Sequence, residues 1–146
     1  MDPTKVYLAQ SDTTVGFLSQ NSEKLREIKN RASKKPFIIS VDSFETLKKF
    51  VRVPKNHRRF IRKSKKTTFV YPKNIAIRVV KDKNHLNFLK KIKWCYTTSA
   101  NPSGGAFCLD FAKENADVVV EDERGFFEDT PSKIIKCGKI SKRRLR

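Results

Sequence analysis

The chain has 146 residues, of which 38% are hydrophobic, and a formal net charge of +18 from 33 Lys and Arg against 15 Asp and Glu. This length fits one domain of ordinary size, so we predict a single domain over residues 1–146. A charge this positive favours polyanionic partners such as RNA, DNA or phosphorylated small molecules. The alternative is a general coating of lysine, because net charge informs on solubility and steering rather than on fold.

Several protein classes are excluded by residue types that are missing or wrongly spaced. The three cysteines, Cys95, Cys108 and Cys137, form no C-x-x-C pair, which argues against a disulfide framework and a zinc site. The two histidines lie 28 residues apart, at His57 and His85, and neither has metal-ligand spacing. No apolar run approaches the roughly 20 residues of a membrane span. We therefore expect a soluble, cytoplasmic protein with no bound metal and no membrane contact.

The first elements are a strand, a loop and a helix. A strand over residues 6–8 leads into residues 10–16, Q-S-D-T-T-V-G, which are rich in hydroxyl groups. Such a loop either closes a turn with its own side chains or binds a ligand at the end of a strand. A helix over residues 23–29 follows, with Asn21 or Ser22 as its N-cap.

Basic residues gather at the end of this first helix and just after it, at Lys29, Arg31 and Lys35. They form either a solvated helix end that suits the helix dipole or a clamp for phosphate. The apolar run F-I-I-S-V that follows, over residues 37–41, is typical of a strand covered on both faces.

The next helix and the most basic section come together. Asp42 or Ser43 caps a helix whose buried side carries Phe44, Leu47 and Phe50. Residues 52–66 then contain eight Lys and Arg, interrupted by apolar bulk only at Phe60 and Ile61. We expect a basic helix over the edge of the domain, which is either a solvated face or a nucleic-acid contact.

Two strands and a helix occupy the middle of the chain. Residues 67–71 and 75–80 read as strands joined by P-K-N, as a hairpin or as neighbours. Arg78 lies inside the second strand, where a charge needs a partner or a ligand. Asp82 caps a helix whose apolar side carries Leu86, Phe88, Leu89 and Ile92.

The stretch 94–105, W-C-Y-T-T-S-A-N-P-S-G-G, begins as a strand and ends as a small, polar loop before a helix over residues 107–115. Backbone N–H groups, hydroxyls and the helix N-terminus suit an anion there, although small polar loops are also ordinary surface turns. Strands over residues 117–120, 132–136 and 138–142 follow. The irregular alternation predicts an α/β (α+β) domain built on a mixed sheet.

Seven motifs occur along the chain in a fixed order: Q-S-D-T-T-V-G-F (10–17), K-N-R (29–31), K-P-F-I-I (35–39), T-F-V (68–70), A-I-R-V (76–79), T-S-A-N-P-S-G (98–104) and P-S-K-I (131–134). In this order they resemble the YrdC-like family, the threonylcarbamoyl-AMP synthases. The T-S-A-N-x-S-G loop paired with K-x-R is the most specific part. The chain resembles a short, partly degenerate member, since the first loop lacks the family's Pro and has Val15 in place of its Tyr.

The resemblance implies a fold and a reaction. The fold is a twisted, mixed sheet with flanking helices around a large basic cavity. The reaction is transfer of a nucleotidyl group from ATP to L-threonine plus bicarbonate, with release of pyrophosphate. The product, L-threonylcarbamoyladenylate, serves formation of N6-threonylcarbamoyladenosine at position 37 of tRNA. The resemblance thus implies ATP, threonine and bicarbonate as substrates, proteins of the threonylcarbamoyl-transfer complex and tRNA as partners, and Mg²⁺ held mainly by the ATP phosphates and water.

The resemblance also implies a set of site residues. The catalytic residues implied are Lys29, Arg31, Ser99 and Asn101. Those implied for ATP are Arg31, Lys35, Thr68, Ser99, Asn101, Ser103 and Lys142. Those implied for threonine are Thr13, Ser40, Arg78 and Ser132. These types suit nucleotidyl transfer, in which the protein mainly positions phosphates and neutralises their charge. We expect Lys29 and Ser99 to face each other across one cavity.

A second hypothesis keeps the fold without the catalysis. The charge of +18, the basic section 52–66 and the basic tail 142–146 are also typical of a module that binds RNA, either tRNA or double-stranded RNA. Nucleotide binding separates the two hypotheses, because only the enzyme requires it.

Overall fold

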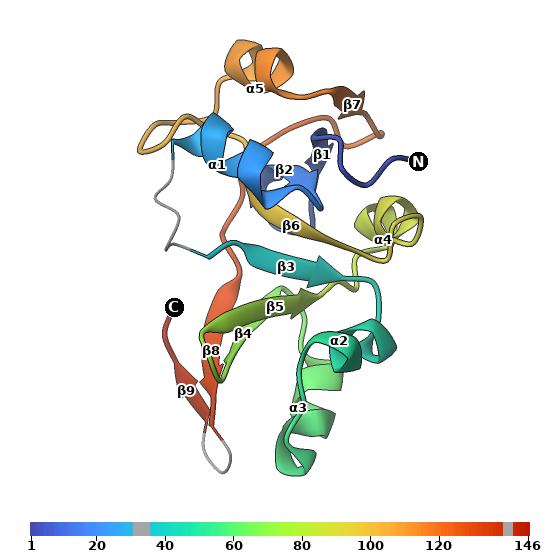
Figure 1. The fold of residues 1–146 in the computed structure, drawn as a ribbon, viewed down its shortest axis with the longest axis vertical. Helices are drawn as coiled ribbons and strands as arrows, with labels where there is room; N and C mark the ends of the chain where they lie inside the picture. Colours follow the sequence, from blue (N-terminus) through green and yellow to red (C-terminus); the bar gives the residue numbers. More distant parts are fainter. Residues whose placement is uncertain (31–35, 139–141) are drawn as a thin grey trace.

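The computed structural model describes residues 1–30, 36–138 and 142–146, which form one twisted sheet with helices around it (Figure 1). Its strands are β1 (Tyr7–Gln10), β2 (Val15–Ser19), β3 (Ile38–Val41), β4 (Thr67–Tyr71), β5 (Ile75–Val79), β6 (Trp94–Ser99), β7 (Val118–Val120), β8 (Lys133–Cys137) and β9 (Lys142–Arg144). Their order in the sheet is β7-β1-β2-β6-β3-β5-β4-β8-β9. The pairs β1–β7, β3–β5 and β4–β8 are parallel and the other pairs are antiparallel, so the predicted mixed sheet is confirmed.

Three of the helices begin where the sequence places a capping side chain. The helices are α1 (Ser22–Lys29), α2 (Phe44–Phe50), α3 (Arg58–Lys63), α4 (Lys83–Leu89) and α5 (Leu109–Asn115), with a 3₁₀ turn at Lys55–His57 before α3. Asn21, Ser43 and Asp82 each accept a hydrogen bond from a backbone N–H of the first turn of α1, α2 and α4. In these three helices the side chain of the N-cap residue thus satisfies one of the first backbone N–H groups, whereas α3 and α5 have no such side-chain cap.

Two faces of the sheet are covered differently. On one face, Leu8 and Phe17 belong to a hydrophobic cluster with Leu25 of α1, and Ile39 belongs to a second hydrophobic cluster with Leu47 of α2. The strand neighbours of these residues point to the opposite face, because side chains alternate along a strand. There Tyr7, Ala9, Leu18 and Cys95 pack with Phe88 and Leu89 of α4. The helices α1, α2, α3 and α5 therefore share one face, and α4 covers only part of the other.

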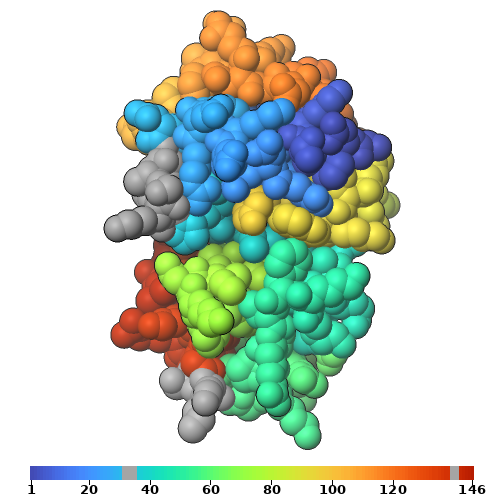
Figure 2. All heavy atoms as spheres, viewed as in Figure 1, coloured from blue at the N-terminus to red at the C-terminus, as the bar shows by residue number. Residues whose placement is uncertain are grey.

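The upper and lower halves of the molecule come from different parts of the chain (Figure 2). In the view of Figure 1, α1, α5, β1, β2 and β7 lie above the middle of the sheet. The helices α2 and α3 and the strands β8 and β9 lie below it. Within the described residues no helix is long and apolar enough to cross a membrane.

The predicted strand over residues 138–142 falls largely on residues 139–141, which lie outside the described residues, and β9 covers Lys142–Arg144. Two other local predictions need correction. Residues 10–16 are predicted as a loop, but Gln10 ends β1, and Val15 and Gly16 begin β2, which pairs with β6 in antiparallel register. The basic section 52–66 forms a 3₁₀ turn and the short helix α3 rather than one basic helix.

Candidate functional site

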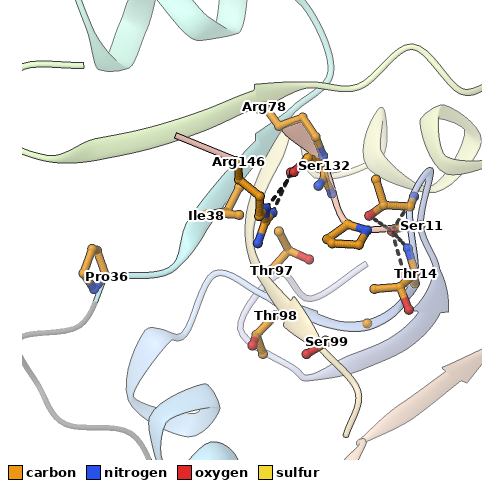
Figure 3. A pocket seen from close by; sticks show the side chains of 13 residues that line it. Ser11, Thr14, Pro36, Ile38, Arg78, Thr97, Thr98, Ser99, Ser132 and Arg146 are labelled. Carbon is orange, nitrogen blue, oxygen red and sulfur yellow. Dashed lines mark hydrogen bonds between the residues drawn. The ribbon is translucent and has the colours of Figure 1, made fainter. Parts of the chain in front are cut away.

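A cavity of about 270 Å³ opens on the sheet face that α4 covers only in part (Figure 3). Gly16 and Thr97 line it. Each lies two residues along its strand from a residue that packs against α4, Leu18 and Cys95 respectively, so the cavity and α4 are on the same face of the sheet. Seven of the lining residues carry hydroxyl groups and two are arginines: Ser11, Thr13, Thr14, Thr97, Thr98, Ser99 and Ser132, with Arg78 and Arg146. Gly16, Pro36, Ile38 and Pro131 complete the lining. The wall is thus rich in donors and positive charge, as anion binding requires.

One wall is the loop between β1 and β2. The Ser11 hydroxyl donates to the Thr14 carbonyl at 2.6 Å and accepts from the Thr13 and Thr14 N–H groups at 3.1 and 3.2 Å. The Thr13 hydroxyl lies 3.2 Å from that of Ser11. The loop therefore closes a turn with its own side chains, as one of the two interpretations predicts. Its residues Ser11, Thr13 and Thr14 also line the cavity, and ligand binding by this loop stays a prediction.

Arg124 ties this loop to the acidic segment after β7. Its guanidinium donates to the Gln10 carbonyl at 3.1 Å and to the Ser11 carbonyl at 3.4 Å, and it pairs with Asp122 at 2.7 Å and Asp82 at 3.1 Å. The loop backbone is therefore held from outside the cavity by a residue more than a hundred positions away in the chain. The sequence offered no signal for this role beyond a lone Arg among acids.

Arg78, a charged residue inside an apolar strand, is paired with Asp12. Its guanidinium lies 3.2 Å from Asp12, and the two side chains are 5% and 3% exposed. The His85 ring nitrogen Nδ1 lies 3.5 Å from the same Asp12 oxygen, with no exposed surface. Burial raises the pKa of Asp12, but His85 and the charge of Arg78 outweigh burial and leave that pKa below its ordinary value. Burial lowers the pKa of His85, which favours a neutral ring.

Two buried donors beside the cavity have no hydrogen-bond partner within the described residues. They are Nε of Arg78, a side chain that lines the cavity, and the hydroxyl of Ser40, which is fully buried. Ser40 and Arg78 are paired residues in the register of β3 and β5. Since a buried donor without a partner is unfavourable, this pair marks a place for a ligand acceptor.

Ser132 links the last part of the cavity wall to β4. Its hydroxyl lies 2.8 Å from that of Thr68, which is fully buried beneath it. Arg146 donates to the Ser132 carbonyl at 2.8 Å and to its hydroxyl at 3.2 Å. Partial burial and the nearby charge of Arg78 lower the pKa of Arg146, as expected where two guanidinium groups converge. An anion between them would relieve that repulsion.

Lys29 and the loop after β6 are brought together, as expected, but in direct contact rather than across a cavity. Lys29 is 5% exposed, and its Nζ donates to the Ser99 carbonyl at 3.0 Å and to the Asn101 carbonyl at 2.6 Å. It also donates to Oδ1 of Asn101 at 3.0 Å, and the Ser99 hydroxyl donates to that same oxygen. Only Ser99 of these three residues lines the cavity.

Four other predicted residues stand apart from the cavity or cannot be placed. Lys142 is exposed and its Nζ lies 4.3 Å from the centre of the Phe60 ring, outside the cavity lining. Ser103 is exposed at the tip of its loop and is also outside the lining. Arg31 and Lys35 lie outside the described residues. The cation that reaches the cavity from the C-terminal segment is Arg146, which sequence reasoning missed because the tail K-R-R-L-R offers four similar cations.

Known proteins share this architecture. The family model Sua5/YciO/YrdC, described as telomere recombination, matches residues 12–146. P. abyssi Sua5 in complex with L-threonine superposes with a TM-score of 0.80 at 18% identity, covering 98% of this chain and 50% of Sua5. The chain thus spans about half the length of that protein.

Two further structures have the same fold. E. coli YciO superposes with a TM-score of 0.78 at 14% identity, covering 98% of this chain and 82% of YciO. Full-length HypF in a phosphate- and nucleotide-bound form superposes with a TM-score of 0.72 at 18% identity, covering 98% of this chain and 27% of HypF. No curated protein sequence matches the chain significantly. At such low identities the superpositions establish the fold.

Proposed function

This chain belongs to the Sua5/YciO/YrdC family, and we propose that its cavity binds L-threonine and ATP and forms L-threonylcarbamoyladenylate. The observation that carries the proposal is the pair of buried donors, Nε of Arg78 and the Ser40 hydroxyl, that have no partner among the described residues. Arg78 lines the cavity together with a second arginine, Arg146, and seven residues that carry hydroxyl groups, and Ser40 is paired with Arg78 across β3 and β5. This arrangement suits a ligand with a carboxylate next to phosphates.

Threonine is the ligand that we assign to the deep part of the cavity. Arg78 would hold the threonine carboxylate through Nε, because Asp12 already fixes its other end. Ser40, Thr13 and Ser132 would take the remaining polar groups. A volume of about 270 Å³ is at the low end for ligand pockets, so it accommodates an amino acid while the nucleotide extends over the rim. That P. abyssi Sua5 binds L-threonine on the same fold supports this assignment.

The phosphates of ATP would lie between Arg146 and the loop after β6. Arg146 contributes a planar, forked donor, and Ser99 presents its end of the loop to the cavity. Lys29 holds that loop through three hydrogen bonds, so we assign it to positioning the loop rather than to touching phosphate. The phosphate- and nucleotide-bound form of HypF supports a nucleotide site on this fold. Arg31, Lys35, Thr68, Asn101, Ser103 and Lys142 keep their assignment to ATP as predictions.

The proposed chemistry has two steps. The threonine amine attacks the carbon of bicarbonate and water leaves, which gives a carbamate. A carbamate oxygen then attacks the α-phosphorus of ATP, the bond to the bridging oxygen breaks, and pyrophosphate leaves. Charge gathers on phosphate oxygens in the second step, where fixed guanidinium groups are most effective. Mg²⁺ would stay with the phosphates and water, because Asp12, the carboxylate beside the wall, is engaged by Arg78.

Purified protein with ATP, L-threonine, bicarbonate and Mg²⁺ should release pyrophosphate only when threonine is present. The sharpest variant is Ser40→Ala. Since the hydroxyl has no partner in the structure, its removal should leave stability unchanged or improved while it raises the KM for threonine by roughly tenfold. Ser19→Ala is the matched control, because Ser19 is equally buried but bonds the Thr4 carbonyl away from the cavity.

The control should lose about 1 kcal/mol of stability and keep its KM. Absence of threonine-dependent pyrophosphate release, together with failure to restore the tRNA modification in a strain lacking the synthase, would overturn the proposal. The non-catalytic alternative finds less support in the cavity itself, where Arg78 is buried against Asp12 and Arg146 is bonded to Ser132. Most basic residues lie elsewhere on the molecule.

A further inference from the structure

The charge of this protein is divided between two ends of the molecule. Residues 46–81 and 130–146 hold 20 of the 33 Lys and Arg and none of the 15 Asp and Glu. These two segments form α3, β4, β5, β8 and β9, which lie together at the lower end in Figures 1 and 2. The pairing of β4 with β8 joins the two segments within the sheet. The fold therefore concentrates positive charge that the sequence splits between two distant stretches.

The cations of this end point into solvent. In α3 only Ile61 is buried, and the other five residues are exposed. We call the following set the basic end: Arg58, Arg59, Arg62 and Lys63 of α3, Lys133 and Lys136 of β8, and Lys142, Arg143 and Arg144 of β9, all of them exposed. None of these residues forms an ion pair with another described residue. Their mutual repulsion is therefore left for a bound polyanion to neutralise.

An aromatic ring lies among these cations. Phe60 is 42% exposed, and the Lys142 Nζ lies 4.3 Å from its centre, which places β9 beside α3. The Phe60 ring packs against Phe69 of the sheet in an edge-to-face arrangement, with 5.8 Å between the ring centres. A ring held in this way, exposed and surrounded by cations, suits stacking with an unpaired base.

We propose that the basic end binds RNA, with its cations on the phosphates and Phe60 under an unpaired base. A folded RNA offers both elements, because a helical backbone and a loop of unstacked bases lie close together in a hairpin. A lipid surface would need a broader apolar face, and Phe60 and Leu145 are the large exposed hydrophobic side chains at this end of the described chain. This function is separate from the cavity and does not depend on the proposed synthase activity.

The test uses a fluorescently labelled RNA hairpin and the whole chain. The variant Arg59→Glu, Lys63→Glu, Arg143→Glu reverses three exposed cations of the basic end. The control Lys5→Glu, Lys83→Glu, Lys113→Glu reverses three exposed lysines elsewhere. Each set lowers the net charge by six, from +18 to +12. The first set should weaken binding by roughly a hundredfold and flatten its salt dependence, and the control should weaken it by less than about tenfold.

The role of the ring is tested by Phe60→Leu, which keeps apolar volume but removes the stacking surface. Phe127→Leu is its control, because Phe127 is also 42% exposed but lies outside the basic end. Phe60→Leu should weaken binding to the hairpin by about tenfold and leave binding to a blunt RNA duplex unchanged. Equal losses from the two triple variants, or hairpin affinity untouched by Phe60→Leu, would overturn the proposal.

Two further measurements separate this proposal from others. Binding to phosphatidylserine vesicles without binding to the hairpin would overturn it in favour of a membrane surface. Ser40→Ala should bind RNA as the unmodified protein does, so that loss of threonine binding and loss of RNA binding are distinguished. RNA binding that fails together with the cavity variant would place the RNA in the cavity and contradict the proposal.

Discussion

The buried and the exposed cations of this protein have different roles. Arg78 and Lys29 are enclosed, and each has named oxygen partners at 2.6 to 3.2 Å. The cations of the basic end are exposed and lack acidic partners among the described residues. The first group therefore sets the shape and stability of the cavity wall, and the second sets the long-range field. Substitutions of the same residue type in the two groups should separate these roles.

Arg78→Met should produce the largest effect. It leaves the buried carboxylate of Asp12 without its cation, and breaking such a pair costs about 3–5 kcal/mol. Arg59→Met, the matched change at the basic end, should alter the free energy of unfolding by less than about 0.5 kcal/mol. Urea denaturation of both variants measures the difference. Similar losses from the two would mean that burial does not distinguish the two groups.

Lys29→Met should cost less, about 2–3 kcal/mol, because the three hydrogen bonds of one ammonium group are lost at the loop after β6. Lys24→Met is the control on the same helix, since Lys24 is half exposed and lies 3.7 Å from Asp117. A pair of that kind contributes about 0–1 kcal/mol. Thermal unfolding, read together with nucleotide binding, should show both properties reduced for Lys29→Met alone.

Acid should act on the buried network rather than on the basic end. Burial lowers the pKa of His85 in the folded protein, so the unfolded chain takes up this proton first. The contribution of His85 to the free energy of unfolding is fully present above the ordinary pKa of histidine. It is lost as the pH falls below that pKa, by up to about 1.4 kcal/mol per pH unit. The lowered pKa of Asp12 adds a second loss below the ordinary range of aspartate.

The measurement is the free energy of unfolding as a function of pH, for the unmodified protein and for His85→Gln. The slope on acidification from neutral pH should be smaller in His85→Gln. An unchanged slope would show that the pKa of His85 does not differ between the folded and the unfolded protein.

Added salt should have the smallest effect on stability, and it should stabilise the protein, whereas the substitutions and acid destabilise it. At a net charge of +18, like charges at the basic end repel one another, and added salt screens that repulsion. We expect the melting temperature to rise by a few degrees or less between low and moderate NaCl concentrations. The triple variant Arg59→Glu, Lys63→Glu, Arg143→Glu should show a weaker rise, and an equal rise would place the repulsion elsewhere.

The sequence by itself determined the class of the fold and most of its elements. Capping residues such as Asn21, Ser43 and Asp82 mark helix starts because their side chains satisfy local N–H groups. The ordered motifs identified the family, and the family model confirms it. These signals are readable because they depend on neighbours in the chain. The strand β2 was missed because Gly16 and Ser19 lack strand propensity, and its pairing with β6 decides it.

Only the tertiary structure decided which charges meet in the cavity. Nothing near Arg78 in the chain marks Asp12 as its partner, and nothing in the tail separates Arg146 from Lys142. Antiparallel pairing of β8 with β9 returns the chain so that Arg146 reaches Ser132, while Lys142 lies over Phe60. Such contacts join residues that are distant in the chain, and their energy depends on burial and distance, which strand pairing fixes and local sequence does not.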